Sequence, residues 1–226
     1  MMRPGVLVFD VNETLIDIDS LRPYFGRVFG DPLVFREWFG QLVTYSMAIT
    51  LAGRYIDFFT LGQGVLRMTA EVHGVEVGDD DLRGLTEAMR TMPAHPDAAE
   101  GLQRLRANGF RLVTLTNSPH RDGPTPLEQA GLAEYFEHQF SVDEQRAFKP
   151  SPALYTGVAG DLGVAPAACM MVAAHMWDTI GAQSAGFRGA FIARAGNAVL
   201  AAPGVPQPNV IASDLLQLNG ILEKLS

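Results

Sequence analysis

The sequence predicts an α/β fold, a doubly wound parallel sheet with a Rossmann-like core and an inserted all-helical cap. Val6 to Phe9 form a short unbroken apolar run that is typical of a strand buried on both faces, and Asp10 follows at once. After residue 93, strand-like and helical segments alternate, which indicates parallel strands with crossover helices. Residues 16–92 show helical spacing without a clear strand. We therefore assign residues 1–15 and 93–226 to the core domain and 16–92 to the cap domain.

Composition limits the classes of function. The chain has 226 residues and a net charge of −8, and 47% of its residues are hydrophobic. An acidic chain is a poor partner for a nucleic-acid backbone, and no stretch is long and apolar enough to span a bilayer. Cys169 is the only cysteine, which excludes an internal disulfide and favours a reducing, cytoplasmic location, with the thiol buried in an apolar run. The sequence predicts a small-molecule substrate, no nucleic-acid or membrane partner, and leaves a homodimer open.

Apolar residues at three- and four-residue spacing predict the helices of the cap. The first stripe consists of Phe35, Trp38, Phe39, Leu42, Ser46 and Ile49, and Gly53 is placed to end that helix. The second stripe consists of Leu61, Val65, Met68 and Val72, and Gly74 closes it. Three consecutive aspartates at 79–81 precede a third helical stripe. These acids suit a helix N-terminus better than a metal site.

The core domain is expected to continue with a regular series of elements. Asp97 is placed to cap a helix, and Asn108 with Gly109 is placed to stop it. We expect helices at 97–107, 126–130, 152–162, 179–185 and 214–225. We expect strands at 111–115, near 140, at 169–174, at 189–193 and at 210–212.

Polar side chains stand at the predicted strand ends and in one loop. They are Asp10 with Thr14, the run Thr116, Asn117 and Ser118, then Lys149 and Asp178. In a doubly wound sheet such ends converge on one crevice. Each residue also has a simpler explanation, as a turn former, a solvated lysine or a helix cap. Their joint occurrence at the expected places favours a site.

These residue types suggest a division of roles. The Asp10 carboxylate is able to attack carbon and form an ester. Lys149 would keep Asp10 ionised and offset the repulsion of Asp178, which would position or activate water. The remaining candidates for binding an anionic substrate group are Thr116, Asn117, Ser118 and the turn after Asp10, with Val11 and Asn12.

Taken together, these segments resemble the haloacid dehalogenase superfamily over nearly the whole chain. The four matching motifs are Phe9-Asp10-Val11-Asn12-Glu13-Thr14-Leu15, Leu115-Thr116-Asn117-Ser118, Phe148-Lys149-Pro150 and Ala173-Ala174-His175-Met176-Trp177-Asp178. The helical insertion resembles the cap of type II L-2-haloacid dehalogenases at Tyr45-Ser46, Gly53-Arg54-Tyr55 and Asp57-Phe58. Tyr155, six residues after Lys149, matches a tyrosine of the dehalogenase site.

The resemblance implies a hydrolase that converts short 2-haloalkanoic acids into 2-hydroxy acids without a cofactor. Asp10 would displace the halide from C2, and water would then open the aspartyl ester. Lys149 would balance charge, and Thr14 and Tyr155 would support the site. Phe39, with Trp38, would form an apolar wall, although such a stripe is commonly plain core.

Two other functions remain open. Most members of the superfamily are phosphotransferases, which generally carry an acid two positions after the nucleophile and use Mg²⁺. Asn12 stands at that position and cannot donate a proton as a carboxylic acid does, whereas a halide leaves without one. The adjacent Glu13 is not treated as its replacement, because neighbouring side chains point in different directions. A magnesium-dependent phosphatase and a non-catalytic binding relative are the alternatives.

The sequence also departs from the type II pattern. Those enzymes usually carry Tyr at the Asn12 position and Gly at the Glu13 position. Their cap arginine corresponds to Phe39 here, so that Arg36 or Arg54 would have to replace it.

The fourth motif departs as well. Its usual serines are replaced by Ala173 and Ala174, and its Asn by His175. His175 fits either water activation or a structural role.

Overall fold

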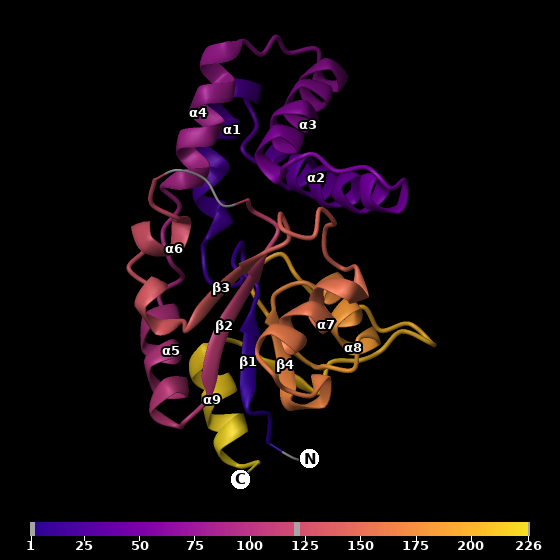
Figure 1. Ribbon diagram of the computed structural model, residues 1–226. Coiled ribbons are helices and arrows are strands. Elements are labelled where there is room, and N and C mark those ends of the chain that lie inside the picture. Colours follow the sequence, from indigo (N-terminus) through magenta and orange to yellow (C-terminus); the bar gives the residue numbers. More distant parts are fainter. Residues whose placement is uncertain (1–2, 120–122, 226) are drawn as a thin grey trace.

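The computed structural model describes residues 3–119 and 123–225 and contains one six-stranded parallel sheet, which confirms the predicted fold class (Figure 1). The strand order is β3-β2-β1-β4-β5-β6. The strands are β1 (Val6–Phe9), β2 (Arg111–Thr116), β3 (His138–Ser141), β4 (Cys169–Ala173), β5 (Arg188–Ile192) and β6 (Val210–Ala212). Because the chain order reverses beside β1, the carboxyl end of this strand faces the crevice where open α/β sheets place their ligands.

Helices lie on both faces of the sheet and above the carboxyl ends of its strands (Figure 1). The core helices are α5 (Ala98–Ala107), α6 (Pro126–Gln129), α7 (Pro152–Asp161), α8 (Met176–Ser184) and α9 (Leu215–Glu223). In Figure 1, α5 and α9 lie on the side of the sheet opposite to α7 and α8. Short 3₁₀ helices occur at Ile18–Leu21, Ala133–Tyr135 and Pro166–Ala168. This arrangement buries the central strands on both faces.

The burial of the central strands follows from their composition. All four residues of β1 and all five of β4 are buried, as their unbroken apolar runs predict. Cys169 begins β4 and is a buried free thiol, as expected. Burial raises the pKa of this thiol to about 11, so that it is protonated at neutral pH.

Four helices lie above the carboxyl ends of the strands in Figure 1, and we call them the cap helices. They are α1 (Arg22–Phe29), α2 (Val34–Leu51), α3 (Phe58–His73) and α4 (Asp79–Arg90). The sequence pattern predicts α2, α3 and α4 individually, but not α1. Gly74 ends α3 with a left-handed φ of 65°. Val72, the last residue of the predicted stripe, is not part of the buried face: its side chain is 73% exposed.

Two backbone crossings connect the cap helices to the core. Asp17 N–H donates to Pro93 O over 2.8 Å, and His95 N–H donates to Leu15 O over 2.9 Å. Ile16 and Ala94 form an antiparallel bridge between these hydrogen bonds. The two passages of the chain therefore run side by side.

The predicted side-chain cap at Asp97 and the predicted start of α8 were wrong. Asp97 does not cap α5 with its side chain; it forms an ion pair with Arg194 at 2.6 Å and accepts the backbone N–H of Leu215 over 2.8 Å. Helix α8 begins at Met176, three residues earlier than the pattern indicates, so that Asp178 lies inside its first turn. An apolar residue at the first helical position hides such a start.

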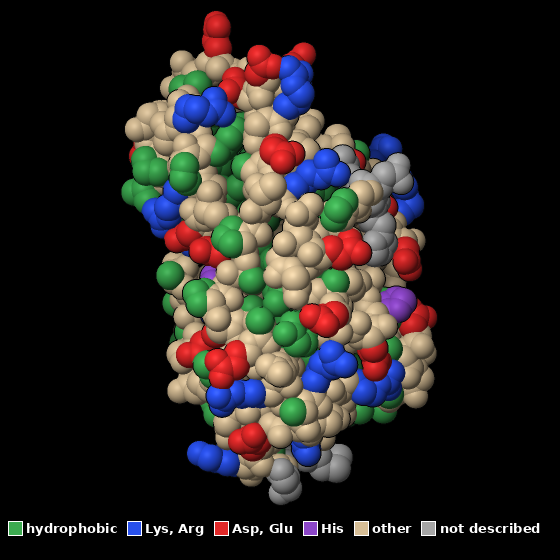
Figure 2. Space-filling model, turned by 90° about the vertical axis from the view of Figure 1, so that its left-hand side faces the viewer, with side chains coloured by type: hydrophobic (Ala, Val, Ile, Leu, Met, Phe, Trp, Pro, Cys, Tyr) green, Lys and Arg blue, Asp and Glu red, His purple; other side chains and the backbone are tan. Residues whose placement is uncertain are grey.

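Acidic and basic side chains are interspersed on the face shown in Figure 2. None of the helices in the described residues is both long enough and apolar enough to cross a membrane.

Candidate active site

The site is built around Asp10, the first residue after β1. Its backbone N–H donates to Val172 O on β4 over 3.0 Å, which extends the pairing of β1 with β4 by one residue. This hydrogen bond fixes the backbone position from which the Asp10 side chain extends. Asp10 is only 4% exposed. A carboxylate held so deeply must be paired with cations or hydrogen-bond donors.

Lys149 supplies the main pairing. Its Nζ lies 2.8 Å from Asp10 Oδ1 and 2.6 Å from Asp178 Oδ2, and it donates to Leu115 O over 2.9 Å. The lysine is fully buried. All three donors of the ammonium group are therefore used, and the ions predicted from separate parts of the chain meet at one point.

Two hydroxyl groups complete this network. Thr14 Oγ1 donates to Asp10 Oδ2 over 2.7 Å and accepts the backbone N–H of Ala174 over 2.9 Å. Tyr155 donates to Asp178 Oδ1 over 2.6 Å. Both oxygens of Asp178 are thus occupied, and this residue is fully buried.

The pKa values of this network follow from burial and charge. Burial acts to raise the pKa of Asp10, but the charge of Lys149 and the hydrogen bond from His175 outweigh it and lower that pKa. Burial likewise acts to lower the pKa of Lys149, and the charges of Asp10 and Asp178 reverse that effect. The structure therefore favours an ionised Asp10 beside a charged lysine.

His175 contacts the other side of the Asp10 carboxylate. Its Nδ1 lies 3.3 Å from Asp10 Oδ2, and its Nε2 lies 2.7 Å from Glu13 Oε2. Burial acts to lower the pKa of His175, but hydrogen bonds to both carboxylates and their charges raise it to about 9. At neutral pH the ring is an imidazolium that donates to both acids.

Glu13 reaches His175 because of an unusual backbone conformation. Its φ is 68°, in the left-handed region that favours glycine, and its N–H donates to Ile16 O over 2.8 Å. Nε2 of His95 lies 3.0 Å from Glu13 O. This turn directs the Glu13 side chain into the site, where it is 3% exposed.

The cap places one arginine at the site, where the guanidinium is bound to other protein groups. The Arg36 guanidinium contacts the Glu13 carboxylate through Nη1, while Nη2 lies 2.8 Å from Asp19 Oδ1 and 3.0 Å from Ala195 O. Arg54 is exposed. Of the two candidates for a replacement cap arginine, only Arg36 contacts an active-site residue.

Aromatic side chains of the cap divide into two roles. The Phe39 ring lies 5.8 Å from the His175 ring, and so it borders the site as expected. Trp38 is fully buried and donates to Gly62 O over 2.9 Å, which makes it part of the packing between α2 and α3. The predicted apolar wall therefore contains Phe39 but not Trp38.

The residues predicted to bind an anionic group lie together beside Asp10. Asn117 accepts the backbone N–H of Lys149 through Oδ1 over 3.1 Å, and Thr116 accepts the N–H of Ser118 over 3.1 Å. Asn12 Nδ2 lies 3.4 Å from Ser118 Oγ. Asn117 and Thr116 thus shape the loops, while Ser118 and Asn12 face each other across the gap between two of them.

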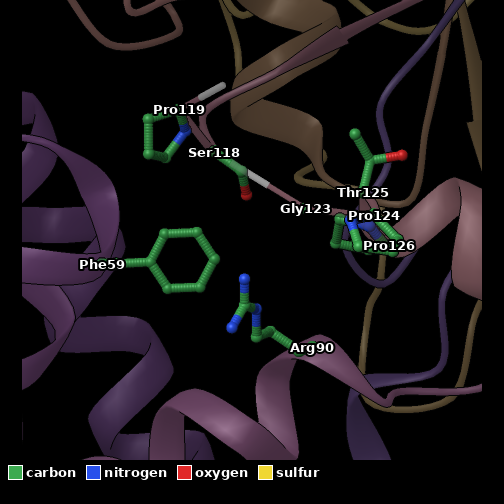
Figure 3. A pocket seen from close by; sticks show the side chains of 8 residues that line it. All are labelled: Phe59, Arg90, Ser118, Pro119, Gly123, Pro124, Thr125 and Pro126. Atoms are coloured by element: carbon green, nitrogen blue, oxygen red, sulfur yellow. The ribbon is translucent and has the colours of Figure 1, made fainter. Parts of the chain in front are cut away.

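Two small cavities adjoin Ser118. One of about 40 Å³ is lined in part by Val11, Thr116 and Ser118. The other, also of about 40 Å³, is lined in part by Ser118, Phe59 and Arg90; Figure 3 shows the Arg90 guanidinium beside the ring of Phe59, with the Ser118 side chain above it. Among residues 3–119 and 123–225, no group of three or more His, Cys, Asp or Glu side chains is arranged to hold a metal ion.

Sequence reasoning missed or left open part of this site. The sequence pattern does not indicate His95, and it does not place Glu13 in the site, because adjacent side chains normally diverge. It leaves Arg36 as one of two candidates for the cap arginine. A signal was present for Glu13, since a position that relatives fill with Gly indicates a left-handed turn. No comparable pattern pointed to His95.

Comparisons with known proteins agree with this geometry. A family model described as haloacid dehalogenase-like hydrolase matches residues 5–186. The (S)-2-haloacid dehalogenase of Xanthobacter autotrophicus is 32% identical over 200 residues, which cover 86% of this chain and 77% of that protein. The (S)-2-haloacid dehalogenase 1 of Pseudomonas sp. (strain CBS-3) is 31% identical over 182 residues, which cover 80% of each chain.

The fold is also shared with a solved structure. The L-2-haloacid dehalogenase from Xanthobacter autotrophicus with chloropropionic acid covalently bound has a TM-score of 0.87 and 25% identity, with full coverage of both chains. The sheet, the ion network and these matches lead to one conclusion: the chain belongs to the haloacid dehalogenase-like hydrolases.

Proposed function

We propose that this hydrolase cleaves the carbon–halogen bond of short 2-haloalkanoic acids and releases 2-hydroxy acids. One observation carries the proposal: an ionised Asp10 carboxylate is held between Lys149, Thr14 and His175 at the carboxyl end of the central strand. Such a carboxylate is a nucleophile that needs no prior deprotonation. The Xanthobacter relative, whose structure carries covalently bound chloropropionic acid, supports the same chemistry.

In the first step, an oxygen of Asp10 attacks C2 of the substrate. A carbon–oxygen bond forms as the carbon–halogen bond breaks, and the electron pair leaves with the halide. Lys149 and Thr14 hold the carboxylate in orientation, which lowers the entropy that the reaction has to lose. The substrate carboxylate is received near Ser118, with Phe39 on the apolar side.

In the second step, water attacks the ester carbonyl of Asp10, and we assign the base to His175. Ester formation removes the negative charge of Asp10, which is one of the causes that raise the His175 pKa to about 9. The ring then releases its proton to solvent and presents a free Nδ1 toward the ester. It takes one proton from the attacking water, and the bond between the Asp10 acyl carbon and the product oxygen then breaks. The second proton of that water passes to the leaving product oxygen, so that Asp10 returns as a carboxylate and the sum of both steps releases halide and one proton.

Asp178 acts in this scheme through its neighbours. One of its oxygens accepts a hydrogen bond from Lys149 and the other accepts one from Tyr155, and the residue is fully buried. It keeps the lysine charged and in place. Water activation therefore falls to His175, with Asp178 as a positioning residue.

Asn12 favours a halide over a phosphate ester as the leaving group. Its side chain lies near Ser118 and offers no acidic proton to a leaving alkoxide. We propose that the reaction proceeds without a metal cofactor, and the lone cysteine favours a cytoplasmic setting.

The decisive experiment measures halide release from a panel of 2-haloacids beside phosphate release with and without Mg²⁺. We expect halide release that is unaffected by a chelator, and its loss in Asp10→Asn. Turnover in heavy-oxygen water should label Asp10 before the product. Chelator-sensitive phosphate release without halide release would establish the phosphatase instead, and ligand-induced stabilisation without any turnover would indicate a binding protein.

A further inference from the structure

Arg36 belongs to the cap helix α2, yet its guanidinium contacts three groups outside that helix. These are the Glu13 and Asp19 carboxylates and the Ala195 carbonyl. Ala195 lies in the loop after β5, and Glu13 lies in the turn after β1, so both are core residues. Arg36 therefore connects the cap to two core loops at the edge of the site.

The Glu13 carboxylate divides its two oxygens between the cap and the site. Oε1 contacts Arg36, and Oε2 lies 2.7 Å from His175 Nε2. His175 in turn reaches Asp10 through Nδ1 over 3.3 Å. One continuous chain of ionic contacts thus runs from the cap helix to the nucleophile.

Backbone strain supports a functional reason for Glu13. The φ of 68° at Glu13 lies in the left-handed region, which is disfavoured for a residue with a side chain. Glycine would adopt this turn without that cost, but it would offer His175 no partner. The acidic side chain is retained at a strained position where it joins Arg36 to His175.

We propose that Arg36 is a positioning residue that aligns the Glu13–His175 pair for water activation when the cap lies on the core. This inference rests on the proposed function. Arg36 holds one oxygen of Glu13, so that the other points at Nε2 and orients the ring toward the ester. Burial acts to raise the pKa of Glu13, but the hydrogen bonds and charges of His175 and Arg36 lower it. The positive charge of Arg36 also opposes a second positive charge on the His175 ring, which shares the Glu13 carboxylate with it.

Several charged groups surround this chain and are part of its electrostatics. Lys149 faces Asp10 from the loop before α7, and Asp19 faces Arg36 from the 3₁₀ helix Ile18–Leu21. His95 contacts the Glu13 carbonyl, and Arg194 contacts the Thr14 carbonyl from the loop after β5. The Arg36 variants leave all of these groups unchanged.

The test separates the two chemical steps with 2-chloropropionate. Rapid-quench halide release reports formation of the ester, and steady-state turnover with the mass of the Asp10 peptide reports its hydrolysis. The variants are Arg36→Gln, Arg36→Lys, Glu13→Gln and the double variant of Arg36→Gln with Glu13→Gln. Arg27→Gln is the matched control, because Arg27 pairs with Asp81 within the cap helices.

We expect Arg36→Gln to keep first-turnover halide release within about twofold while steady-state turnover falls about tenfold and alkylated enzyme accumulates. In the Glu13→Gln background, Arg36→Gln should lower steady-state turnover by less than about twofold, because both substitutions remove the same contact. Arg36→Lys should restore part of the loss, and Arg27→Gln should change neither step.

An equal loss from Arg36→Gln in both backgrounds would overturn the inference and leave Arg36 as a simple cap contact. A loss confined to first-turnover halide release would overturn it too. If the wild-type protein releases no halide at all, the proposed function fails and the inference fails with it. A wild type and an Arg36→Gln variant that both turn over normally would overturn the inference and leave the proposed function standing.

Discussion

Two charged networks meet at the Asp10 carboxylate, and they differ in the origin of their members. The Lys149 network joins Asp10, Asp178 and Tyr155, all of which belong to core loops and helices. The Glu13–His175 network ends instead at Arg36 on the cap helix α2. The core domain contains every member of the first network, whereas the second is complete only when the cap lies on the core. The proposed nucleophile is thus paired within the core, whereas the proposed water-activating pair also depends on a contact from the cap.

Removal of the central cation should break the first network most severely. Lys149→Met leaves the buried Asp10 and Asp178 carboxylates facing each other without a counter-charge. We expect a loss of about 3–5 kcal/mol in the free energy of unfolding, measured by urea denaturation, together with loss of halide release. Lys224→Met is the matched control, because Lys224 is exposed. Unchanged stability in Lys149→Met would contradict the buried charge pairing.

Removal of the ring should break the second network without touching the first. His175→Asn keeps Asp10 and Lys149 in contact, so first-turnover halide release should persist, while steady-state turnover should fall by about 10²-fold or more. Rapid-quench and steady-state assays give the two numbers. His138→Asn, a change at the exposed start of β3, is the control. Equal losses in both phases would assign His175 to the first step instead.

The charge of His175 should also appear in stability as a function of pH. Its folded-state pKa of about 9 lies above the ordinary value of 6.5, so the folded protein binds this proton more tightly than the unfolded chain. The contribution of the charged ring to the free energy of unfolding is fully present below pH 6.5 and is lost as pH rises through about 9. This contribution is on the order of 3 kcal/mol, and it is measured as the difference in the free energy of unfolding between wild type and His175→Asn in urea denaturation. A difference that stays constant or grows with pH would contradict a charged ring in the folded protein.

A contact that belongs to neither network provides the smallest expected effect. Tyr55 donates to Asp143 Oδ1 over 2.5 Å between the segment linking α2 to α3 and the loop after β3. Tyr55→Phe should lower the free energy of unfolding by about 1 kcal/mol in thermal unfolding and leave both chemical steps unchanged. Tyr45→Phe is the control, since Tyr45 is 41% exposed. A specific loss of steady-state turnover in Tyr55→Phe would mean that any cap contact, and not Arg36 in particular, governs water activation.

The Lys149 network was the part of the site that sequence reasoning located. Asp10 follows a strand directly, and Asp178 lies just past another, so strand ends in a parallel sheet had to bring them to one edge. The predictions were less accurate for the side-chain cap at Asp97 and for the start of α8 at Met176. The Asp97 side chain pairs instead with Arg194, which is distant in the sequence, and no local pattern encodes that choice.

The sequence by itself determined the parallel α/β core and predicted the helical insertion and Asp10 as the nucleophile, because apolar periodicity and strand-end chemistry are local properties of the chain. The tertiary structure alone decided that Glu13 turns into the site and that Arg36 meets it there. The first depends on a left-handed backbone angle at one residue, and the second on how a cap helix lies over two core loops. Neither the sign of a dihedral angle nor the docking of two layers is written in residue spacing, since both result from the balance of many distant contacts.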